Sequence, residues 1–145
     1  LLEPGTISAL YEASMAGVKI DLIVRGVCAL RPGIKGLSEN IRVRSIVGRL
    51  LEHHRVFYFF AGGTEQVYLS SADWMERNFF RRIELAFPVL DKKLKRRVIA
   101  EGLQTYMADN LQSWDMDSNG SYHPRRASRN KPRCAQSELL ELLKP

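Results

Sequence analysis

The sequence contains little that would cross a membrane or hold a structural metal. No apolar run approaches the roughly 18 residues that a membrane-spanning helix needs, and no signal peptide is recognisable. Its two cysteines, Cys28 and Cys134, are far apart and belong to no CxxC or Cys/His cluster, so the sequence offers no structural zinc site. We expect reduced thiols in a cytoplasmic protein, although a disulfide between the two stays open.

Motifs of several common enzyme classes are also missing. There is no Walker A sequence, and the segment 70–73 (SSAD) has no GxSxG context, so a P-loop or an ordinary hydrolase site lacks support. Asp115 and Asp117 superficially resemble a calcium loop, but the closing Glu of the EF-hand spacing is absent. The acidic residues therefore predict no metal site.

Positive charge, by contrast, is abundant. The chain of 145 residues has 22 Lys and Arg against 16 Asp and Glu, a net charge of +6, and 15 of the cations are Arg. Guanidinium groups bind phosphate and carboxylate bidentately, which favours a polyanionic partner without identifying it. At 45% hydrophobic and 26% charged residues, the chain has a globular composition, which excludes wholesale disorder.

The first half of the sequence predicts alternating helices and strands. Pro4 begins a helix that Gly17 ends, and a buried strand follows at 18–24. Residues 25–40 form a long Gly-rich loop before a strand at 41–47. The pattern of residues 48–52 does not assign them to a helix, a strand or a loop.

The second half continues with a hairpin and further helices. Strands at 56–60 and 66–69 flank Gly62-Gly63, and Asp73 caps a short helix that reaches Phe80. A last strand is predicted at 83–87. Asp91 then caps a helix whose apolar stripe comprises Ile99, Leu103, Tyr106 and Met107. Residues 115–136 read as a polar loop, and Ser137 caps a terminal helix at 137–145.

Two groups of residues are candidates for phosphate chemistry. Arg25 ends an apolar strand where the Gly-rich loop begins, at the strand end where α/β sheets bind ligands. His53 and His54 precede the next strand beside Arg55, and imidazole with arginine is suited to phosphoryl transfer. The alternatives are an ion pair that closes the loop at Arg25 and histidines that are only hydrogen-bonded structure.

The remaining cations are assigned less specific roles. Eight of them lie between Lys19 and Arg55, and solvated strand faces explain most of these. The basic segment 125–133 contains Arg125, Arg126, Arg129, Lys131 and Arg133. It has no interleaved aromatic residues for stacking on bases, so we interpret it as a solvated loop. His123 is interpreted as a surface residue.

The order of motifs in residues 1–89 resembles the C-terminal part of bacterial polyphosphate kinase, the family that phosphorylates itself on histidine. The similar runs are LYEASMAGVKIDLIVRGVCALRPGIKGLSENIRVRSIVGRLLEHHRVFYFF and VYLSSADWMERNFFRRIELAFPV. The pieces DNLQSW, GSYHPR and AQSELL resemble the family more loosely. The resemblance implies a phospholipase-D-like α/β/α layered domain with a mixed sheet. The chain, 1–145, would be the second of two such domains that face each other across a phosphate channel, excised from a longer enzyme.

The resemblance also implies roles for three residues. The LEH-x-R motif makes His53 the catalytic and phosphate-binding histidine and His54 its variable neighbour. The IVRG motif places a phosphate-binding arginine at Arg25, and the DWM-x-RN-x-x-x-R motif places the second at Arg82. The sequence departs from the family at 78–80 (NFF), where many relatives have an acidic residue.

For the full-length enzyme, the resemblance implies reversible transfer of the terminal phosphate of ATP to histidine and then to inorganic polyphosphate. Mg²⁺ is the expected cofactor, but its ligands, the phosphorylated histidine and the adenine site belong to the preceding domains, so we expect no metal site here and an inactive isolated fragment. The expected partners are ATP or ADP and polyphosphate rather than nucleic acid, with peripheral membrane association and a homo-oligomer in the full-length protein.

Two other functions stay in view. One is a non-catalytic module that binds polyphosphate or nucleic acid, because half of an active site should not turn over. The other is a phospholipase or nuclease, which needs an HxK(x)4D pattern. Here Arg55 replaces the lysine and Phe60 stands where that aspartate would be.

Overall fold

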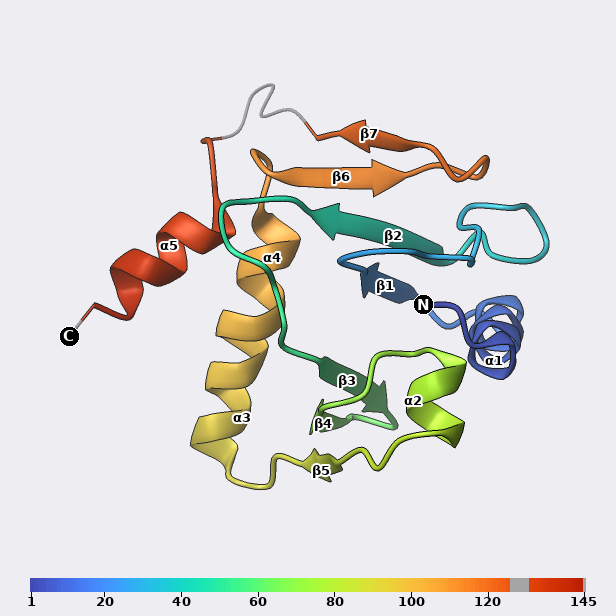
Figure 1. The fold of residues 1–145 in the computed structure, drawn as a ribbon, viewed down its shortest axis with the longest axis horizontal. Helices are drawn as coiled ribbons and strands as arrows, with labels where there is room; N and C mark the ends of the chain where they lie inside the picture. Colours follow the sequence, from blue (N-terminus) through green and yellow to red (C-terminus); the bar gives the residue numbers. More distant parts are fainter. Residues whose placement is uncertain (126–130, 145) are drawn as a thin grey trace.

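The computed structural model describes residues 1–125 and 131–144, and its strands form two sheets (Figure 1). The four-stranded sheet has the order β1–β2–β6–β7, with β1 parallel to β2 and the other pairs antiparallel. Its strands are β1 (Ile20–Ile23), β2 (Ile41–Ile46), β6 (Ser113–Met116) and β7 (Tyr122–Pro124). This sheet is therefore mixed, as the sequence predicts.

The second sheet is a three-stranded antiparallel meander. It consists of β3 (Val56–Ala61), β4 (Thr64–Ser70) and β5 (Ala86–Pro88). Gly62 and Gly63 connect β3 to β4, and both have positive φ angles, 57° and 82°. A two-residue turn of this kind matches the twist of the flanking strands and strongly favours glycine.

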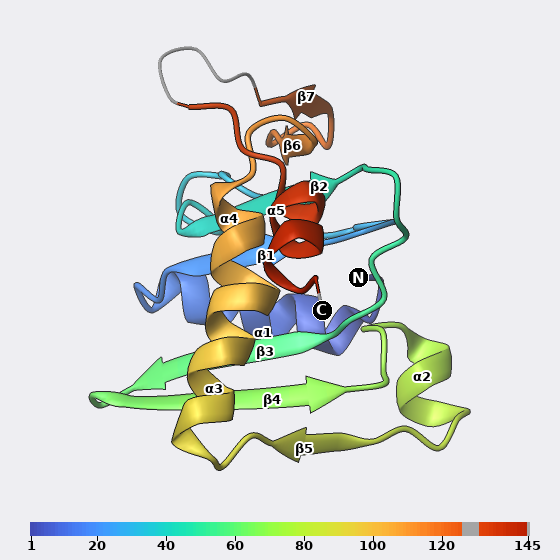
Figure 2. The ribbon, with the colours of Figure 1, turned by 90° about the vertical axis from the view of Figure 1, so that its left-hand side faces the viewer.

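Helices cover both faces of the four-stranded sheet (Figure 2). The helices of the described residues are α1 (Pro4–Met15), α2 (Glu76–Phe80), α3 (Lys92–Ile99), α4 (Thr105–Ala108) and α5 (Ala135–Leu142), and one π-helical turn, η1 (Ala100–Gln104), joins α3 to α4. Helix α1 lies on one face of this sheet and α4 and α5 on the other, whereas α3 packs against β4 of the second sheet. On one face Ile41 and Val43 pack with Ile7 and Leu10 of α1. On the other face Ile46 packs with α4 and α5. The sheet is thus the middle layer of an α/β/α arrangement.

Several predictions from local sequence are confirmed. Helix α1, strand β2 and the β3–β4 hairpin lie where they are expected. Asp91 caps α3 by accepting a hydrogen bond from the Leu94 N–H at 2.8 Å. Cys28 and Cys134 are free thiols. None of the helices in the described ranges is long and apolar enough to cross a membrane.

The assignments around the short helix α2 are wrong in detail. Asp73 does not cap it, because α2 begins at Glu76 and the Asp73 carboxylate pairs with arginines instead. The strand predicted at 83–87 is β5 (Ala86–Pro88), which begins later because its pairing with β4 starts at Ala86, opposite Ser70. The sequence also predicts this strand to be the last one, but β6 and β7 follow it.

The polar loop predicted at 115–136 is also wrong, because it contains much of the β6–β7 hairpin and the start of α5. These strands lack the β-branched residues that mark strands in sequence. They are stabilised by pairing with β2 and by packing of Met116 and Tyr122 into the core.

Helix α5 begins at Ala135, before Ser137, so the range 137–145 predicted for the terminal helix is also corrected. Arg126 and Arg129 of the basic segment lie outside the described residues.

A distant aspartate explains why α5 begins earlier than its sequence indicates. Asp109 is fully buried and accepts hydrogen bonds from the N–H groups of Leu111 and Gln112 at 3.0 and 2.7 Å. It also accepts one from the Ala135 N–H at 2.8 Å, while the local cap position, Cys134, contributes no side-chain hydrogen bond. The end of α4 thus fixes the start of α5.

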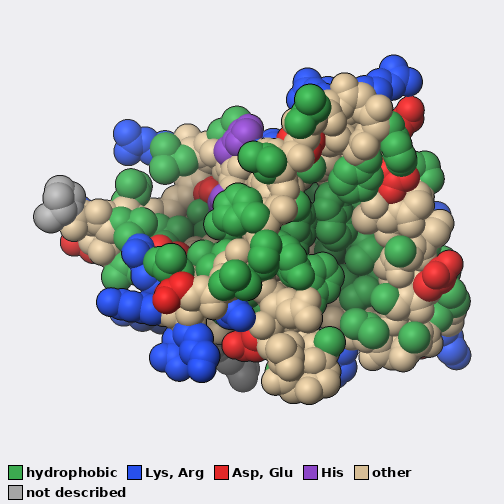
Figure 3. Space-filling model, turned by 90° about the horizontal axis from the view of Figure 1, so that it is seen from below, with side chains coloured by type: hydrophobic (Ala, Val, Ile, Leu, Met, Phe, Trp, Pro, Cys, Tyr) green, Lys and Arg blue, Asp and Glu red, His purple; other side chains and the backbone are tan. Residues whose placement is uncertain are grey.

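The edge of the molecule near β5 exposes apolar side chains (Figure 3). Those more than half exposed include Phe80, Ile83, Leu85, Phe87 and Leu90. Exposed apolar side chains therefore gather beside β5.

Substitution of Asp109 by asparagine is expected to destabilise the α4–α5 connection. An amide cannot accept all three hydrogen bonds, which costs about 2 kcal/mol locally and speeds amide exchange at 109–113 and 134–137 by roughly thirtyfold. Hydrogen–deuterium exchange of the full-length protein measures this change. The control is Asp117→Asn, because Asp117 accepts two backbone N–H groups in the exposed β6–β7 turn. Equal effects of the two substitutions would contradict this role.

Candidate functional site

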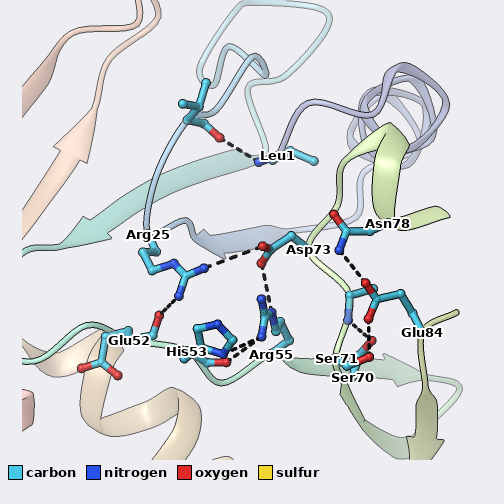
Figure 4. Close-up of polar contacts among 12 residues, drawn as sticks. Leu1, Arg25, Glu52, His53, Arg55, Ser70, Ser71, Asp73, Asn78 and Glu84 are labelled. Carbon is cyan, nitrogen blue, oxygen red and sulfur yellow. Dashed lines mark hydrogen bonds and ion pairs between the residues drawn. The ribbon is translucent and has the colours of Figure 1, made fainter. Parts of the chain in front are cut away.

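A carboxylate between two arginines forms the centre of the candidate site (Figure 4). Asp73 Oδ1 accepts a hydrogen bond from Arg55 Nε at 3.0 Å, and Asp73 Oδ2 lies 3.7 Å from Arg25 Nη2. The hydrogen bond from Arg55 lowers the pKa of Asp73 against the opposing effect of partial burial, and the charges of Arg55 and Arg25 lower it further. Asp73 is therefore ionised at neutral pH and holds the two guanidinium groups close together.

His53 is attached to this group through Arg55. Arg55 Nη1 lies 2.8 Å from His53 Nδ1 and also donates to the His53 carbonyl at 3.0 Å. A guanidinium only donates, so Nδ1 must accept, and the proton of the neutral ring then lies on Nε2. The residue is exposed, and the Nε2–H of this tautomer is a hydrogen-bond donor that remains free for a ligand while Nδ1 is held.

Arg25 is fixed from two sides at the end of β1. Its Nη1 donates to the backbone carbonyl of Glu52 at 2.5 Å, and its Nη2 faces Asp73. Its side chain retains 31% exposure, so other N–H groups remain available to a ligand. The ion pair at the loop that the sequence raised as an alternative is therefore present, and it also orients the guanidinium.

His54 is oriented differently from His53. Its Nε2 lies 3.2 Å from the Gly102 carbonyl of η1, and its ring centroid is 4.9 Å from that of Tyr106. Its Nδ1 lies 3.4 Å from Glu52 Oε2. The adjacent histidines thus have separate environments, and only His53 contacts the arginine–aspartate group.

Arg82 lies outside this hydrogen-bonded group. Within the described residues it forms no ion pair or hydrogen bond. It lines a surface hollow with Trp74 and Phe57, whose rings stack at 5.0 Å. The structure therefore brings His53 and Arg25 together but does not join Arg82 to them by direct contact.

The turn that carries Arg82 is anchored by Glu84. Its carboxylate accepts hydrogen bonds from the Ser71 hydroxyl at 2.5 Å and from Asn78 Nδ2 at 2.7 Å. These two bonds lower the pKa of Glu84, and the charges of Arg82 and Arg55 contribute as well. At the point where the sequence departs from the family, the buried Asn78 amide thus holds this carboxylate.

Sequence reasoning missed the connecting residues of the site. Arg55 was noted only as a neighbour of the histidines, and Asp73 was interpreted as a helix cap. Both belong to the motifs that carry the resemblance, so a carboxylate inside an arginine-rich motif was the available signal. The contact between them joins the start of β3 to the segment before α2, and sequence spacing does not reveal it.

The described residues offer no ligand set for a metal. Within 1–125 and 131–144, no group of three or more His, Cys, Asp or Glu side chains could hold a metal ion. Asp117, in the segment that resembles a calcium loop, pairs instead with the exposed His123 at 2.8 Å. The described residues therefore contain no ready-made cluster for the Mg²⁺ that the resemblance implies.

Comparisons with known proteins match nearly the whole chain. The family model described as polyphosphate kinase C-terminal domain 2 matches residues 1–136. Polyphosphate kinases from Burkholderia lata and Paraburkholderia phytofirmans are 70% and 66% identical to this chain over 140 residues, which cover 97% of this chain and 20% of each relative.

A solved structure agrees with these matches. The crystal structure of polyphosphate kinase from Porphyromonas gingivalis superimposes with a TM-score of 0.93 at 45% identity, and covers 99% of this chain and 22% of that one. The phospholipase-D-like fold expected from the sequence is thereby confirmed. The chain spans about a fifth of the length of the relatives it matches, and it belongs to the polyphosphate kinase C-terminal domain 2 family.

Proposed function

We propose that this domain supplies the phosphate-binding and proton-donating half of the active site of a longer polyphosphate kinase. One observation carries the proposal: His53 Nδ1 is held by Arg55, which shares the Asp73 carboxylate with Arg25. This arrangement places an imidazole donor beside guanidinium groups that are suited to phosphate oxygens.

The proposed reaction has two reversible steps. A histidine nitrogen in another domain attacks the terminal phosphorus of ATP, so that an N–P bond forms, the bond to the bridging oxygen breaks and ADP leaves. A terminal oxygen of polyphosphate then attacks the same phosphorus, and the N–P bond breaks. The polymer gains one phosphate, and the histidine is regenerated.

The residues of this domain act on charge and on a proton. Phosphoryl transfer spreads negative charge over the equatorial oxygens, so catalysis consists mostly of positioning and electrostatic stabilisation. Arg25 and Arg82 bind phosphate oxygens, with Arg82 approaching from its separate turn. His53 donates its Nε2 hydrogen bond, or the proton itself, to the departing oxygen.

Mg²⁺ enters this proposal only as an ion held by other domains. It would neutralise charge on the phosphates, but the described residues contain no cluster of three or more ligand side chains for it, and no step above depends on it. ATP, ADP and polyphosphate are the proposed substrates.

A binding module for polyanions is the second candidate, because the chain carries a net charge of +6. Such a module would need arginines but no oriented histidine. The held His53 ring therefore favours catalysis, and replacing it separates the two functions.

Replacing His53 by alanine in the full-length protein is expected to lower kcat for polyphosphate synthesis by about 100- to 1,000-fold, because a stabilising donor is lost at the reacting phosphate. Circular dichroism should remain unchanged. The matched control is His123→Gln, which is expected to stay within about twofold of wild type because its side chain pairs with Asp117 in the exposed β6–β7 hairpin rather than with the site. Full activity of the His53 variant would refute the assignment, and retained polyphosphate binding without any role in turnover would favour the binding module.

The pH dependence of thermal stability in an Asp73→Asn variant tests whether the Asp73 carboxylate pairs with Arg25 and Arg55. The folded-state pKa of Asp73 is lowered, so its stabilising effect is complete above its ordinary pKa of 3.8 and is lost as pH falls through the lower folded value. The difference in thermal unfolding midpoint between wild type and variant should stay constant from about pH 8 to about pH 5 and shrink in stronger acid. Asp21→Asn, which breaks the exposed pair with Arg42, should change the midpoint little. A midpoint for Asp73→Asn that equals wild type at neutral pH would contradict the pairing.

A further inference from the structure

A buried glutamine of the last helix contacts the segment that leads into the site. Gln136 lies in the first turn of α5 and is 5% exposed. Its Oε1 accepts from the Leu50 N–H at 3.0 Å, and its Nε2 donates to the Leu50 carbonyl at 2.7 Å. The same Nε2 lies 2.7 Å from Glu52 Oε1. The Gln136 amide thus hydrogen-bonds both the backbone of Leu50 and the carboxylate of Glu52.

The segment so held has no regular structure of its own. Residues 47–55 connect β2 to β3 without belonging to a helix or a strand. No sheet hydrogen bonds therefore fix the conformation of residues 48–54, and side chains from elsewhere must do so.

Gly48 allows these side chains to approach. A Cβ at this position would lie 2.4 Å from both Gln112 Oε1 and Gln136 Oε1, distances that real Cβ atoms essentially never show. Because both amides lie against the Gly48 backbone, the segment is packed closely onto α5 and onto the residue before β6 at this point.

Glu52 connects this contact to the site from both its side chain and its backbone. The carboxylate accepts from Gln136 and, at Oε2, from the Tyr106 hydroxyl at 2.8 Å. The carbonyl of the same residue accepts from Arg25 Nη1. The next residue along the chain is His53, so the position of Glu52 sets the position of both proposed site residues.

We propose that Gln136 is a positioning residue for phosphoryl transfer, which holds Leu50 and Glu52 so that Arg25 and His53 face the reacting phosphate. The inference rests on the proposed function of Arg25 and His53, and it adds a residue of α5 to those that shape the site. A displacement of about 1 Å at a reacting group is enough to lower a rate by up to about 100-fold.

The test is a double-mutant cycle in the full-length protein. Gln136→Met keeps the length of the side chain and removes its hydrogen bonds, and we expect kcat to fall about tenfold. In an Arg25→Lys background the same substitution should lower kcat by less than about twofold, because the group that it positions is already impaired. A role in folding alone would give the same loss in both backgrounds.

Gln112→Met is the matched control. Gln112 also lies against Gly48, but its side chain contacts Cys134 rather than Leu50 or Glu52, so its kcat should stay near wild type. If Gln136→Met does not fold, Gln136→Glu replaces it. This variant keeps the acceptor for the Leu50 N–H but places a second carboxylate opposite Glu52. The same non-additive loss of kcat is expected.

The outcomes separate this inference from the function on which it rests. If Arg25→Lys and His53→Ala strongly lower kcat but leave it measurable, while both Gln136 variants behave like Gln112→Met, the positioning role is overturned and the proposed function stands. Additive losses in the cycle also overturn it. If Arg25→Lys and His53→Ala leave synthesis intact, the proposed function itself fails.

Discussion

The arrangement of the site depends on one carboxylate, Asp73, that is shared by two guanidinium groups. Arg25 comes from the end of β1, Arg55 from the start of β3, and Asp73 from the segment before α2. Two arginines so close would repel each other without an anion between them. The carboxylate is 28% exposed, so solvent screens these pairs less than it screens a pair on the open surface. The shared contact therefore connects the two sheets at the point where the candidate site lies.

The irregular segment between β2 and β3 is supported from two directions. On one side Arg55 holds the ring and carbonyl of His53, and on the other Gln136 and Tyr106 hold Glu52. Catalytic groups on irregular segments need such support, because only buried partners fix their geometry. The chain spans about a fifth of the length of the relatives it matches.

Local signals in the sequence predicted the features that neighbouring residues determine. The Gly62-Gly63 hairpin and the Asp91 cap depend on residues within a few positions of each other, and both were predicted correctly. The start of α5 depends on Asp109, which lies 26 residues before Ala135, and the β6–β7 strands depend on pairing with β2. Position in the sequence indicates Arg25 and the His53–His54 pair as candidates, and the family resemblance singles out His53, but the role of Asp73 follows only from contacts across the fold.

Arg55, itself held by Asp73, fixes the orientation and tautomer of the His53 ring. Solid-state NMR of the full-length protein with ¹⁵N-labelled histidine, with the His53 signals identified by their loss in His53→Gln, measures this directly. For the neutral ring we predict an unprotonated Nδ1 that accepts a hydrogen bond and a protonated Nε2, and a mixture of tautomers in Arg55→Ala. A proton on Nδ1 in the wild-type protein, or the same spectrum in Arg55→Ala, would contradict the account.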